Sequence, residues 1–323
     1  IMVDNFDIYN LKENIIEDNT EIISGLENTE QKKINSKHFY DEEGSKLFDK
    51  ITELPEYYPT RTEIEILEKK TRSFQENLPS DAVIIEFGSG SNKKIKKLLK
   101  ALKNPKEYIS IDISYDFLIL NAKEIAKNFP QIDVKAVCAD LYQINELSKL
   151  FKYKKQQKIG FFPGSTIGNF TRGDAKKLLK NFASILGKNN YLIIGIDLRK
   201  NINVMEKAYN DSKGVTAKFN KNILHGINKK IGTNFKVENF DHKAYFNEKK
   251  KRIEMHLISK INQNFSIKDK KIILQKGESI HTENSHKYSI DEFKTLTHSC
   301  GFKTIDFLSD EKNYFGIFFL KVF

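Results

Sequence analysis

The sequence predicts an α/β protein: a doubly wound, Rossmann-like core that carries a second, smaller α+β domain. Between residues 82 and 198, short apolar runs alternate with amphipathic helical patterns, which is typical of a parallel sheet covered by helices. The alternation stops near residue 199, where a helical stretch and then several strand-like segments follow. After residue 286, a helix and two further strands are predicted to return the chain to the first sheet.

Each core element is predicted from its own pattern. Runs such as "AVIIEF" are short, apolar and rich in β-branched residues, as buried parallel strands are. The late helix begins with Ser289 and Glu292, which fit the Ser-x-x-Glu capping box. We expect strands at 82–87, 108–113, 133–139, 158–162 and 191–198, helices at 92–103, 114–129, 144–151 and 172–187, and closing strands at 303–310 and 313–323.

The domain organisation follows from where the alternation is broken. Residues 62–198 plus 287–323 are expected to form the core. Residues 1–61, which carry helical apolar spacing, are expected to join the insertion 199–286 in the second domain. Because ligands of open α/β sheets bind outside the carboxyl ends of the strands, we expect the functional site at that edge.

Composition narrows the class of protein. The 323 residues include only two cysteines, which cannot build a disulfide framework and therefore favour a reducing cytoplasm. No apolar run approaches the roughly 20 residues that cross a bilayer, so no membrane partner is expected. The net charge of +11 comes mainly from lysines scattered over polar helix faces, which favours a solvated surface over a nucleic-acid site. We expect a monomer without a nucleic-acid partner.

A glycine-rich turn follows the first predicted strand in "VIIEFGSGSNKK". Gly88 and Gly90 would let a ligand approach the backbone next to a helix start. Lys93 stands where a dinucleotide fingerprint requires a third glycine, so a pyrophosphate cradle is not predicted. Glu86 and Asp112 could accept hydrogen bonds from ribose hydroxyls. This pattern favours a nucleoside without a diphosphate.

Further residues extend this nucleoside site. Asp140, at the end of the third strand, could accept the adenine amino group, with Leu141 against the ring, and Lys94 could reach a cofactor carboxylate. The layout is that expected for S-adenosylmethionine (SAM). The alternative is an α/β core in which these carboxylates only cap helices and Lys94 is simply exposed. The small polar loop "GSTIGNF" after the fourth strand lies where a methyl acceptor should bind.

Several long strings carry a family resemblance: "FYDEEGSKLFDKITELPEYYPTRTE", "EFGSGSNKK", "GSTIGNF", "AYNDSKGVTAKFNKNIL" and "IEMHL". With these strings the chain, from about Phe39 onward, resembles the histidine Nα-methyltransferases of ergothioneine biosynthesis. The resemblance implies a class I methyltransferase core, SAM as cofactor, and a substrate domain built from the N-terminal segment and a late insertion. It implies methylation of L-histidine to trimethylhistidine (hercynine).

The resemblance also implies a function for individual residues. Tyr40 would lie close to the substrate amine and orient it, and no general base is assigned. The carboxylate would be held by Tyr57, Asn169 and Tyr209, with the backbone of Gly164 lining the site. The imidazole would be bound by Glu283 and Ser285, with Met255 nearby. The cofactor would be held by Gly88, Gly90, Lys94, Asp112, Asp140 and Leu141.

Three alternatives stay open. The string "HTENSH" contains three possible metal ligands, His281, Glu283 and His286. It lacks the helical H-E-x-x-H spacing, so we expect no metal. The substrate could instead be another aromatic amino acid, such as a tryptophan derivative. The basic charge leaves an RNA methyltransferase as a more distant alternative.

Overall fold

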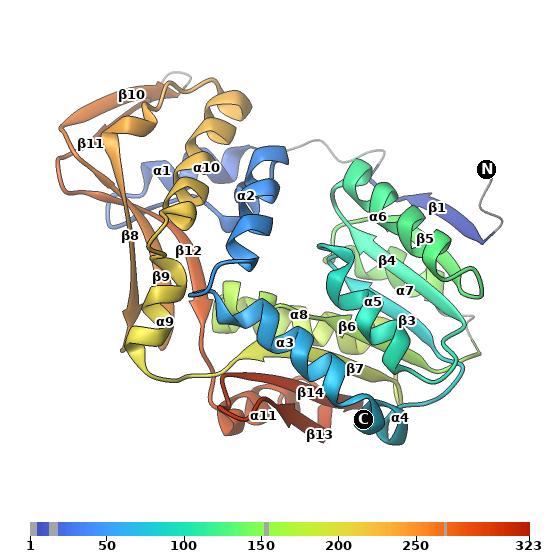
Figure 1. The fold of residues 1–323 in the computed structure, drawn as a ribbon. Helices are drawn as coiled ribbons and strands as arrows, with labels where there is room; N and C mark the ends of the chain where they lie inside the picture. The colour runs from blue at the N-terminus through green and yellow to red at the C-terminus, as the bar shows by residue number, and fades with distance from the viewer. Residues whose placement is uncertain (1–4, 13–18, 152–154, 268–269) are drawn as a thin grey trace. The chain divides into compact units, whose positions relative to one another are not determined.

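The computed structural model describes residues 5–12, 19–151, 155–267 and 270–323 (Figure 1). The chain divides into two compact units. The first unit contains Ile1–Ile15, Thr62–Leu198 and Tyr288–Phe323, and the second contains Ile16–Arg61 and Arg199–Lys287. Among the described residues, no helix combines the length and the apolar character needed to cross a bilayer.

The first unit is built on a mostly parallel sheet. Within the described residues, eight strands lie in the order β1-β5-β4-β3-β6-β7-β14-β13. The strands from β1 to β7 pair in parallel, whereas β14 pairs antiparallel with both β7 and β13. The chain order reverses direction between β4 and β6 on either side of β3, which is the switch point where such sheets bind ligands.

The strands of this sheet other than β1 have bounds close to the predicted ones. Every residue of β3 and β6 is buried, because helices cover both faces of the sheet. The strands are β1 (Phe6–Asn10), β3 (Val83–Phe87), β4 (Glu107–Asp112), β5 (Asp133–Cys138), β6 (Lys158–Phe162), β7 (Tyr191–Asp197), β13 (Phe302–Ser309) and β14 (Phe315–Val322).

Two apolar clusters form the core of the first unit, one on each face of the sheet. The helices that cover the sheet are labelled in Figure 1. One cluster joins the sheet to α7 (Ile144–Phe151), α8 (Arg172–Leu186) and α11 (Ile290–His298). The other joins it to α4 (Thr71–Asn77), α5 (Asn92–Ala101) and α6 (Tyr115–Asn128). The capping box predicted for α11 is confirmed, since the Ser289 side chain accepts from the Glu292 amide and Glu292 reciprocates.

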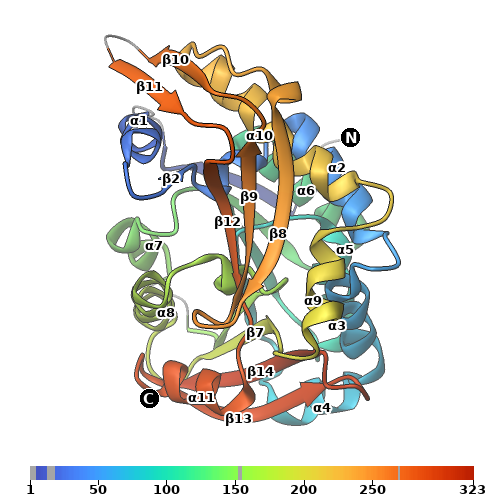
Figure 2. The same cartoon turned by 90° about the vertical axis from the view of Figure 1, so that its left-hand side faces the viewer.

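The second unit is a small, mostly antiparallel sheet with helices, in which β2 pairs with β12 in parallel. Its sheet order is β2-β12-β9-β8, and β10 and β11 form a separate hairpin (Figure 2). The strands are β2 (Lys32–Lys33), β8 (Phe240–Asn247), β9 (Arg252–Ser259), β10 (Gln263–Ile267), β11 (Lys270–Leu274) and β12 (Ser279–His286). The helices are α1 (Thr20–Glu27), η1 (Ser36–Phe39), α2 (Glu42–Thr52), α9 (Ile202–Tyr209), α10 (Val215–Ile231) and η3 (Val237–Asn239), while α3 (Tyr58–Lys69) runs across the boundary between the units.

The start of the chain differs from the prediction. Residues 1–61 were expected to be helical and to belong wholly to the second domain, but β1 pairs with β5 at the edge of the large sheet, with Phe6 opposite Val134. Four of the five β1 side chains are exposed, so the strand carries no alternating apolar pattern. Backbone hydrogen bonds hold an edge strand of this kind, so the pattern of its side chains does not reveal it.

Candidate active site

The glycine-rich turn between β3 and α5 leaves space beside its backbone. Gly88 has φ +77°, and a Cβ added at Gly88 or Gly90 would meet no heavy atom within 4 Å. The amides of Gly88 and Ser89 both donate to the carbonyl of Ile111 on β4, at 2.9 and 3.1 Å. The turn is therefore pinned to the sheet and open toward a ligand, as the sequence predicts for a nucleoside site.

The acidic residues lie at the carboxyl ends of neighbouring strands. Asp112 ends β4, and its Oδ1 accepts from the Ser114 amide at 2.9 Å. Asp140 follows β5, and its Oδ1 accepts from the Tyr142 amide at 2.9 Å. Burial raises the pKa of Asp112 to about 6. Each acid accepts from an amide of the turn that follows it, and both stand at the strand ends where a ligand of this fold binds.

Leu141 and Glu86, two further residues that were predicted to contact the nucleoside, lie in different surroundings. Leu141 is half-buried and packs against the core cluster of α7 and α8. Glu86 is only 2% exposed and accepts a hydrogen bond from the Tyr108 hydroxyl. Burial raises the pKa of Glu86 to about 8, so its carboxyl group is largely protonated at neutral pH. Glu86 therefore belongs to the interior of the sheet.

Lys94 has a partner that the sequence did not indicate. Its Nζ lies 2.7 Å from a carboxylate oxygen of Glu63, a fully buried residue on α3. The same carboxylate accepts from the amide of Gly164 at 3.0 and 3.1 Å. Gly195 makes room for it, because a Cβ there would come within 2.1 Å of the Glu63 Oε1. Glu63 thus ties the predicted cofactor lysine to the loop after β6.

That loop has a constrained backbone. Gly164 and Ser165 both have positive φ, at +80° and +54°. The Ser165 Oγ accepts from the Asp197 amide at 2.9 Å, which fastens the loop to the end of β7. The short helix η2 (Thr166–Asn169) then presents Asn169. The loop therefore brings two of the predicted substrate residues, Gly164 and Asn169, to the same strand end.

In the second unit, Tyr57 occupies a stiff elbow. The tyrosine is 9% exposed, and Pro59 lies in the first turn of α3 directly after it. The Arg61 guanidinium donates to the carbonyls of Leu54 at 3.0 Å and of Tyr57 at 3.3 Å. Pro55 and Pro59 fix φ on either side of the tyrosine pair, and the Arg61 guanidinium holds the same elbow from the next turn.

An aromatic cluster connects the predicted tyrosines. The Phe48 ring lies 5.8 Å from that of Tyr40 and 6.3 Å from that of Tyr57, and the Tyr57 ring lies 6.1 Å from that of Tyr209. Tyr40 is 45% exposed, and its ring packs edge-on against that of Phe48. Desolvation of the phenol, together with the carboxylate of Glu283, keeps the pKa of Tyr40 above its ordinary value. Tyr40 is therefore a protonated phenol near neutral pH.

A β-bulge sets which side chains share a face of the small sheet. His281 pairs with His256, but Glu283 pairs with Met255 and Ser285 with Ile253, so Thr282 is the extra residue. Because side chains alternate along a strand, the bulge turns Glu283 and Ser285 to the face of Met255 and leaves His281 on the opposite face. The single Thr282 hydroxyl proton is shared between the Asn220 Oδ1, at 2.6 Å from Oγ1, and the Met255 carbonyl, at 3.1 Å, and these contacts hold the bulge.

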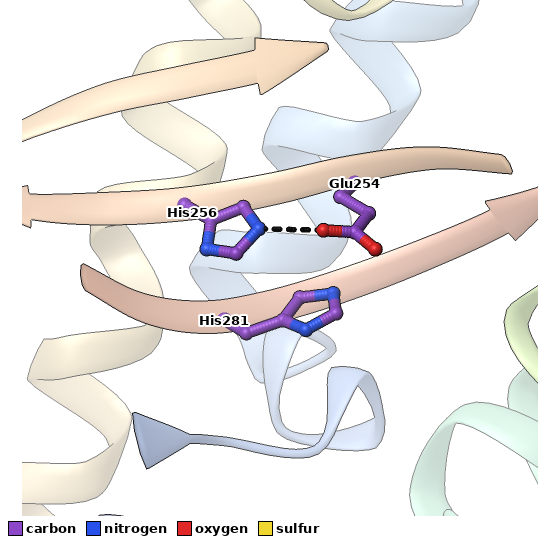
Figure 3. Close-up of side chains that lie close together, drawn as sticks. All are labelled: Glu254, His256 and His281. Atoms are coloured by element: carbon purple, nitrogen blue, oxygen red, sulfur yellow. Dashed lines mark hydrogen bonds and ion pairs between the residues drawn. The ribbon is translucent and has the colours of Figure 1, made fainter. Parts of the chain in front are cut away.

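The opposite face carries a cluster that has the composition of a metal site. Ligand atoms of Glu254, His256 and His281 lie within 4.8 Å of one another (Figure 3). The Glu254 carboxylate, however, already accepts from the His256 Nε2 at 2.9 Å, from Arg252 at 2.7 and 2.8 Å, and from the Tyr245 hydroxyl at 2.8 Å. A guanidinium bound to the same carboxylate would repel a second cation. We interpret the cluster as a charge-paired network.

The network also fixes protonation on that face. Burial alone would raise the pKa of Glu254, but hydrogen bonds from His256, Arg252 and Tyr245 hold it well below the ordinary value. Burial and the adjacent His256 ring lower the pKa of His281 to about 4. Neutral His281 stacks on His256 at 4.5 Å, and its Nε2 lies 3.0 Å from the Glu283 carbonyl. The bulge places His281 and Glu283 on opposite faces of β12, so His281, Glu283 and His286, the alternative considered for "HTENSH", do not form one set of ligands.

The Met255 face holds a compact polar group. The Tyr209 hydroxyl lies 2.9 Å from the Ser285 Oγ, and the Lys287 Nζ lies 2.9 Å from each of these oxygens. Lys287 is 1% exposed, and its ammonium lies 4.8 Å from the centre of the Tyr209 ring. Burial raises the pKa of Glu283 to about 7, and the charge of Lys287 opposes this rise. The face thus combines an acidic acceptor, two hydroxyls and a buried cation beside Met255.

Comparison with known proteins identifies the family. Residues 18–322 match the family described as histidine-specific, SAM-dependent methyltransferases. The chain belongs to this family. The match covers nearly the whole chain, so it includes both units and all the residues described above.

Named relatives of this methyltransferase support the assignment. The chain is 33% identical over 303 residues to a histidine N-alpha-methyltransferase of Mycobacterium tuberculosis, covering 92% of each chain. It is 34% identical over 292 residues to one of Mycolicibacterium smegmatis, covering 88% of this chain and 89% of the relative. It is 27% identical over 319 residues to a 4-dimethylallyltryptophan N-methyltransferase of Claviceps purpurea, covering 90% and 91%.

The predicted residues of this methyltransferase divide between its two units. The sequence did not indicate Glu63, Arg61 and Lys287, because no local pattern distinguishes these charged residues from exposed ones. Arg61 and Glu63 lie in "PTRTE", which belongs to a string that carried the resemblance. The first unit holds Gly88, Gly90, Lys94, Asp112, Asp140, Leu141, Gly164 and Asn169, and the second holds Tyr40, Tyr57, Tyr209, Met255, Glu283 and Ser285.

Proposed function

We propose that the protein transfers methyl groups from SAM to the α-amine of L-histidine and forms trimethylhistidine (hercynine), the step found in ergothioneine biosynthesis. The observation that carries the proposal is the pair Glu283 and Ser285 on one face of β12, next to Met255. An imidazole has one N–H donor and one unprotonated nitrogen, and a carboxylate next to a hydroxyl offers an acceptor and a donor for them. The family to which the chain belongs is histidine-specific.

The residues at the strand ends of the first unit fit SAM. Gly88 and Gly90 leave space beside the backbone, Asp112 and Asp140 provide acceptors for ribose and adenine, and Lys94 provides a cation for a carboxylate. Leu141 would contact the adenine ring. When bound, SAM supplies a sulfonium methyl group that an amine can attack without a covalent enzyme intermediate.

The remaining predicted residues would position the amino acid. Tyr57, Asn169 and Tyr209 would donate to its carboxylate, and Gly164 would line the site with its backbone, although its amide is already bonded to Glu63. Tyr40, which stays protonated, would orient the amine and face the growing ammonium group with its ring. Holding both reactants near attack geometry can lower a barrier by about 7–11 kcal/mol, so positioning is the main contribution we assign to the protein.

Substitution of Glu283 tests the substrate. Glu283→Ala should collapse histidine turnover and leave S-adenosylhomocysteine (SAH) affinity intact, because Glu283 and the predicted cofactor residues belong to different units. A matched control is Glu248→Ala, an exposed glutamate of the same unit. Unchanged histidine turnover in Glu283→Ala would refute the proposal.

A second candidate substrate is a tryptophan-derived amine, as the name of the Claviceps relative suggests. An indole offers one N–H and no basic nitrogen, so it would leave the Ser285 hydroxyl without an acceptor. Titration of the protein with histidine, dimethylhistidine and tryptophan in the presence of SAH separates the two. Tighter binding of tryptophan than of histidine would favour the second candidate.

We also propose that the protein acts as a cytoplasmic monomer without a nucleic-acid partner. The lysines that give the net charge of +11 are distributed along the chain and form no aromatic-interleaved stripe. A gel shift with RNA at two salt concentrations tests this, since an RNA methyltransferase would bind with a steep salt dependence. Size-exclusion chromatography tests the oligomeric state.

A further inference from the structure

The triangle formed by Lys287, Tyr209 and Ser285 constrains the direction of its hydrogen bonds. Each of its three sides is 2.9 Å long. An ammonium has only donors, so both contacts of Lys287 are N–H groups pointing at hydroxyl oxygens. The remaining side joins the two hydroxyls, and the phenol of Tyr209, which is the stronger acid, donates to Ser285.

The number of lone pairs on the Ser285 oxygen determines which further hydrogen bond Ser285 can make. A hydroxyl oxygen has two lone pairs and one proton. One lone pair of Ser285 accepts from Lys287 and the other from Tyr209, so both are occupied. Ser285 is 4% exposed, and the only group it can direct toward a further partner is its own proton. Without Lys287, a lone pair would be released and Ser285 could equally well accept.

We propose that Lys287 is a positioning residue that favours Ser285 as a donor, so that the site binds the neutral imidazole of histidine in a single tautomer. The unprotonated ring nitrogen faces Ser285, and the ring N–H faces the carboxylate of Glu283 on the same strand face. This inference rests on the proposed function and adds the residue that sets its selectivity.

Lys287 serves the carboxylate side as well. Its ammonium donates to the Tyr209 hydroxyl at 2.9 Å, which leaves the proton of that hydroxyl as its contribution to a ligand. A substrate carboxylate is a stronger acceptor than the Ser285 hydroxyl, so it takes the Tyr209 proton when it binds. Binding therefore exchanges the Tyr209–Ser285 hydrogen bond for one to the carboxylate and releases one lone pair of Ser285. The Lys287 ammonium still donates to the Ser285 Oγ, and its positive charge favours the unprotonated ring nitrogen over the ring N–H on that side, so Ser285 stays a donor to the ring.

The tautomer is observable on the unmodified protein. With imidazole-¹⁵N-labelled L-histidine and SAH bound at pH 8, the nitrogen spectrum should show one pyridine-like and one pyrrole-like nitrogen. Free histidine shows averaged signals, because its tautomers exchange. Two protonated nitrogens, or averaged signals in the bound state, would overturn the inference. Failure of histidine to bind at all would instead overturn the proposed function.

A double-mutant cycle assigns the effect to Lys287. Lys287→Met removes the ammonium and keeps an unbranched chain, and Ser285→Ala removes the hydroxyl. Each single variant should raise the histidine Kd about tenfold or more with SAH present. In the double variant the loss should be at least fivefold smaller than the product of the single losses. Losses that multiply within twofold would show that Lys287 acts independently of Ser285.

The controls separate positioning from general support of the fold. SAH affinity should be unchanged in every variant, because the predicted cofactor residues belong to the other unit. Kinetic measurement should show a rise in KM for histidine together with a smaller change in kcat. Lys287→Gln, which keeps an NH2 donor group without charge, should fall between the wild type and Lys287→Met. An equal loss of SAH affinity in all four variants would contradict the inference.

Discussion

We expect the Glu283 carboxylate to lower the stability of the folded protein while it contributes to substrate recognition. Burial raises its pKa from the ordinary 4.5 to about 7. A carboxyl group with a raised pKa in the folded state binds its proton more tightly there than in the unfolded chain, so the folded state is favoured below pH 4.5 and loses stability as the pH rises through 7. Glu283→Gln keeps the shape and removes this titration.

The magnitude follows from the two pKa values. At about 1.4 kcal/mol per pH unit, the interval from 4.5 to about 7 corresponds to at most about 3 kcal/mol. Because the side chain is half-buried and retains some contact with water, we expect Glu283→Gln to gain about 1–3 kcal/mol over the wild type at pH 8 and much less at pH 5. The histidine Kd should rise about tenfold, because the acceptor is no longer charged.

Urea unfolding at pH 5 and pH 8 measures the effect, with Glu248→Gln as an exposed control in the same unit. The difference between Glu283→Gln and the wild type should grow with pH, and that between the control and the wild type should stay constant. Parallel pH profiles for Glu283→Gln and the wild type would refute the reasoning, since they would mean that Glu283 titrates as it does in the unfolded chain.

Three further predictions concern the other interactions. Lys94→Met should destabilise the protein by about 3–5 kcal/mol in urea unfolding, because it leaves the buried Glu63 carboxylate without its cation. Adding Glu63→Gln to this variant should restore stability but not SAH affinity. Recovery of SAH affinity would exclude Lys94 as a cofactor contact. Deletion of Thr282 removes the bulge that separates the faces of His281 and Glu283, so histidine binding should be lost in titration while SAH binding persists; retained histidine affinity would count against the assignment of the Met255 face. Treatment with a chelator should leave turnover and thermal stability unchanged, because Arg252 already pairs with Glu254 in the His256 cluster; a fall in either would reveal a metal.

Much of the first unit was predictable from the sequence for a physical reason. A strand buried on both faces must be apolar throughout, and β3 through β7 are therefore visible as short apolar runs between amphipathic helices. The strand β1 was not predictable, because most of its side chains are exposed and only its backbone joins it to the sheet. The capping box of α11 was predictable because its two hydrogen bonds link residues three apart.

The site was predictable where residue type alone carries the chemistry, as with the glycines of the first turn and the acids at the strand ends. The bulge at Thr282 was not, since a one-residue shift in pairing depends on the partner strand rather than on local sequence. Lys287 and Glu63 are buried charges, and lysine and glutamate are so commonly exposed that no single position signals the exception. Both become intelligible only beside the groups they contact.

The most direct test of the account is calorimetric titration of the purified wild-type protein, saturated with SAH, with L-histidine and with L-tryptophan. The account predicts saturable histidine binding at one site, at least a hundredfold tighter than any binding of tryptophan. Equal affinity for the two amino acids, or no binding of histidine, would contradict the claim that Glu283 and Ser285 form an imidazole site.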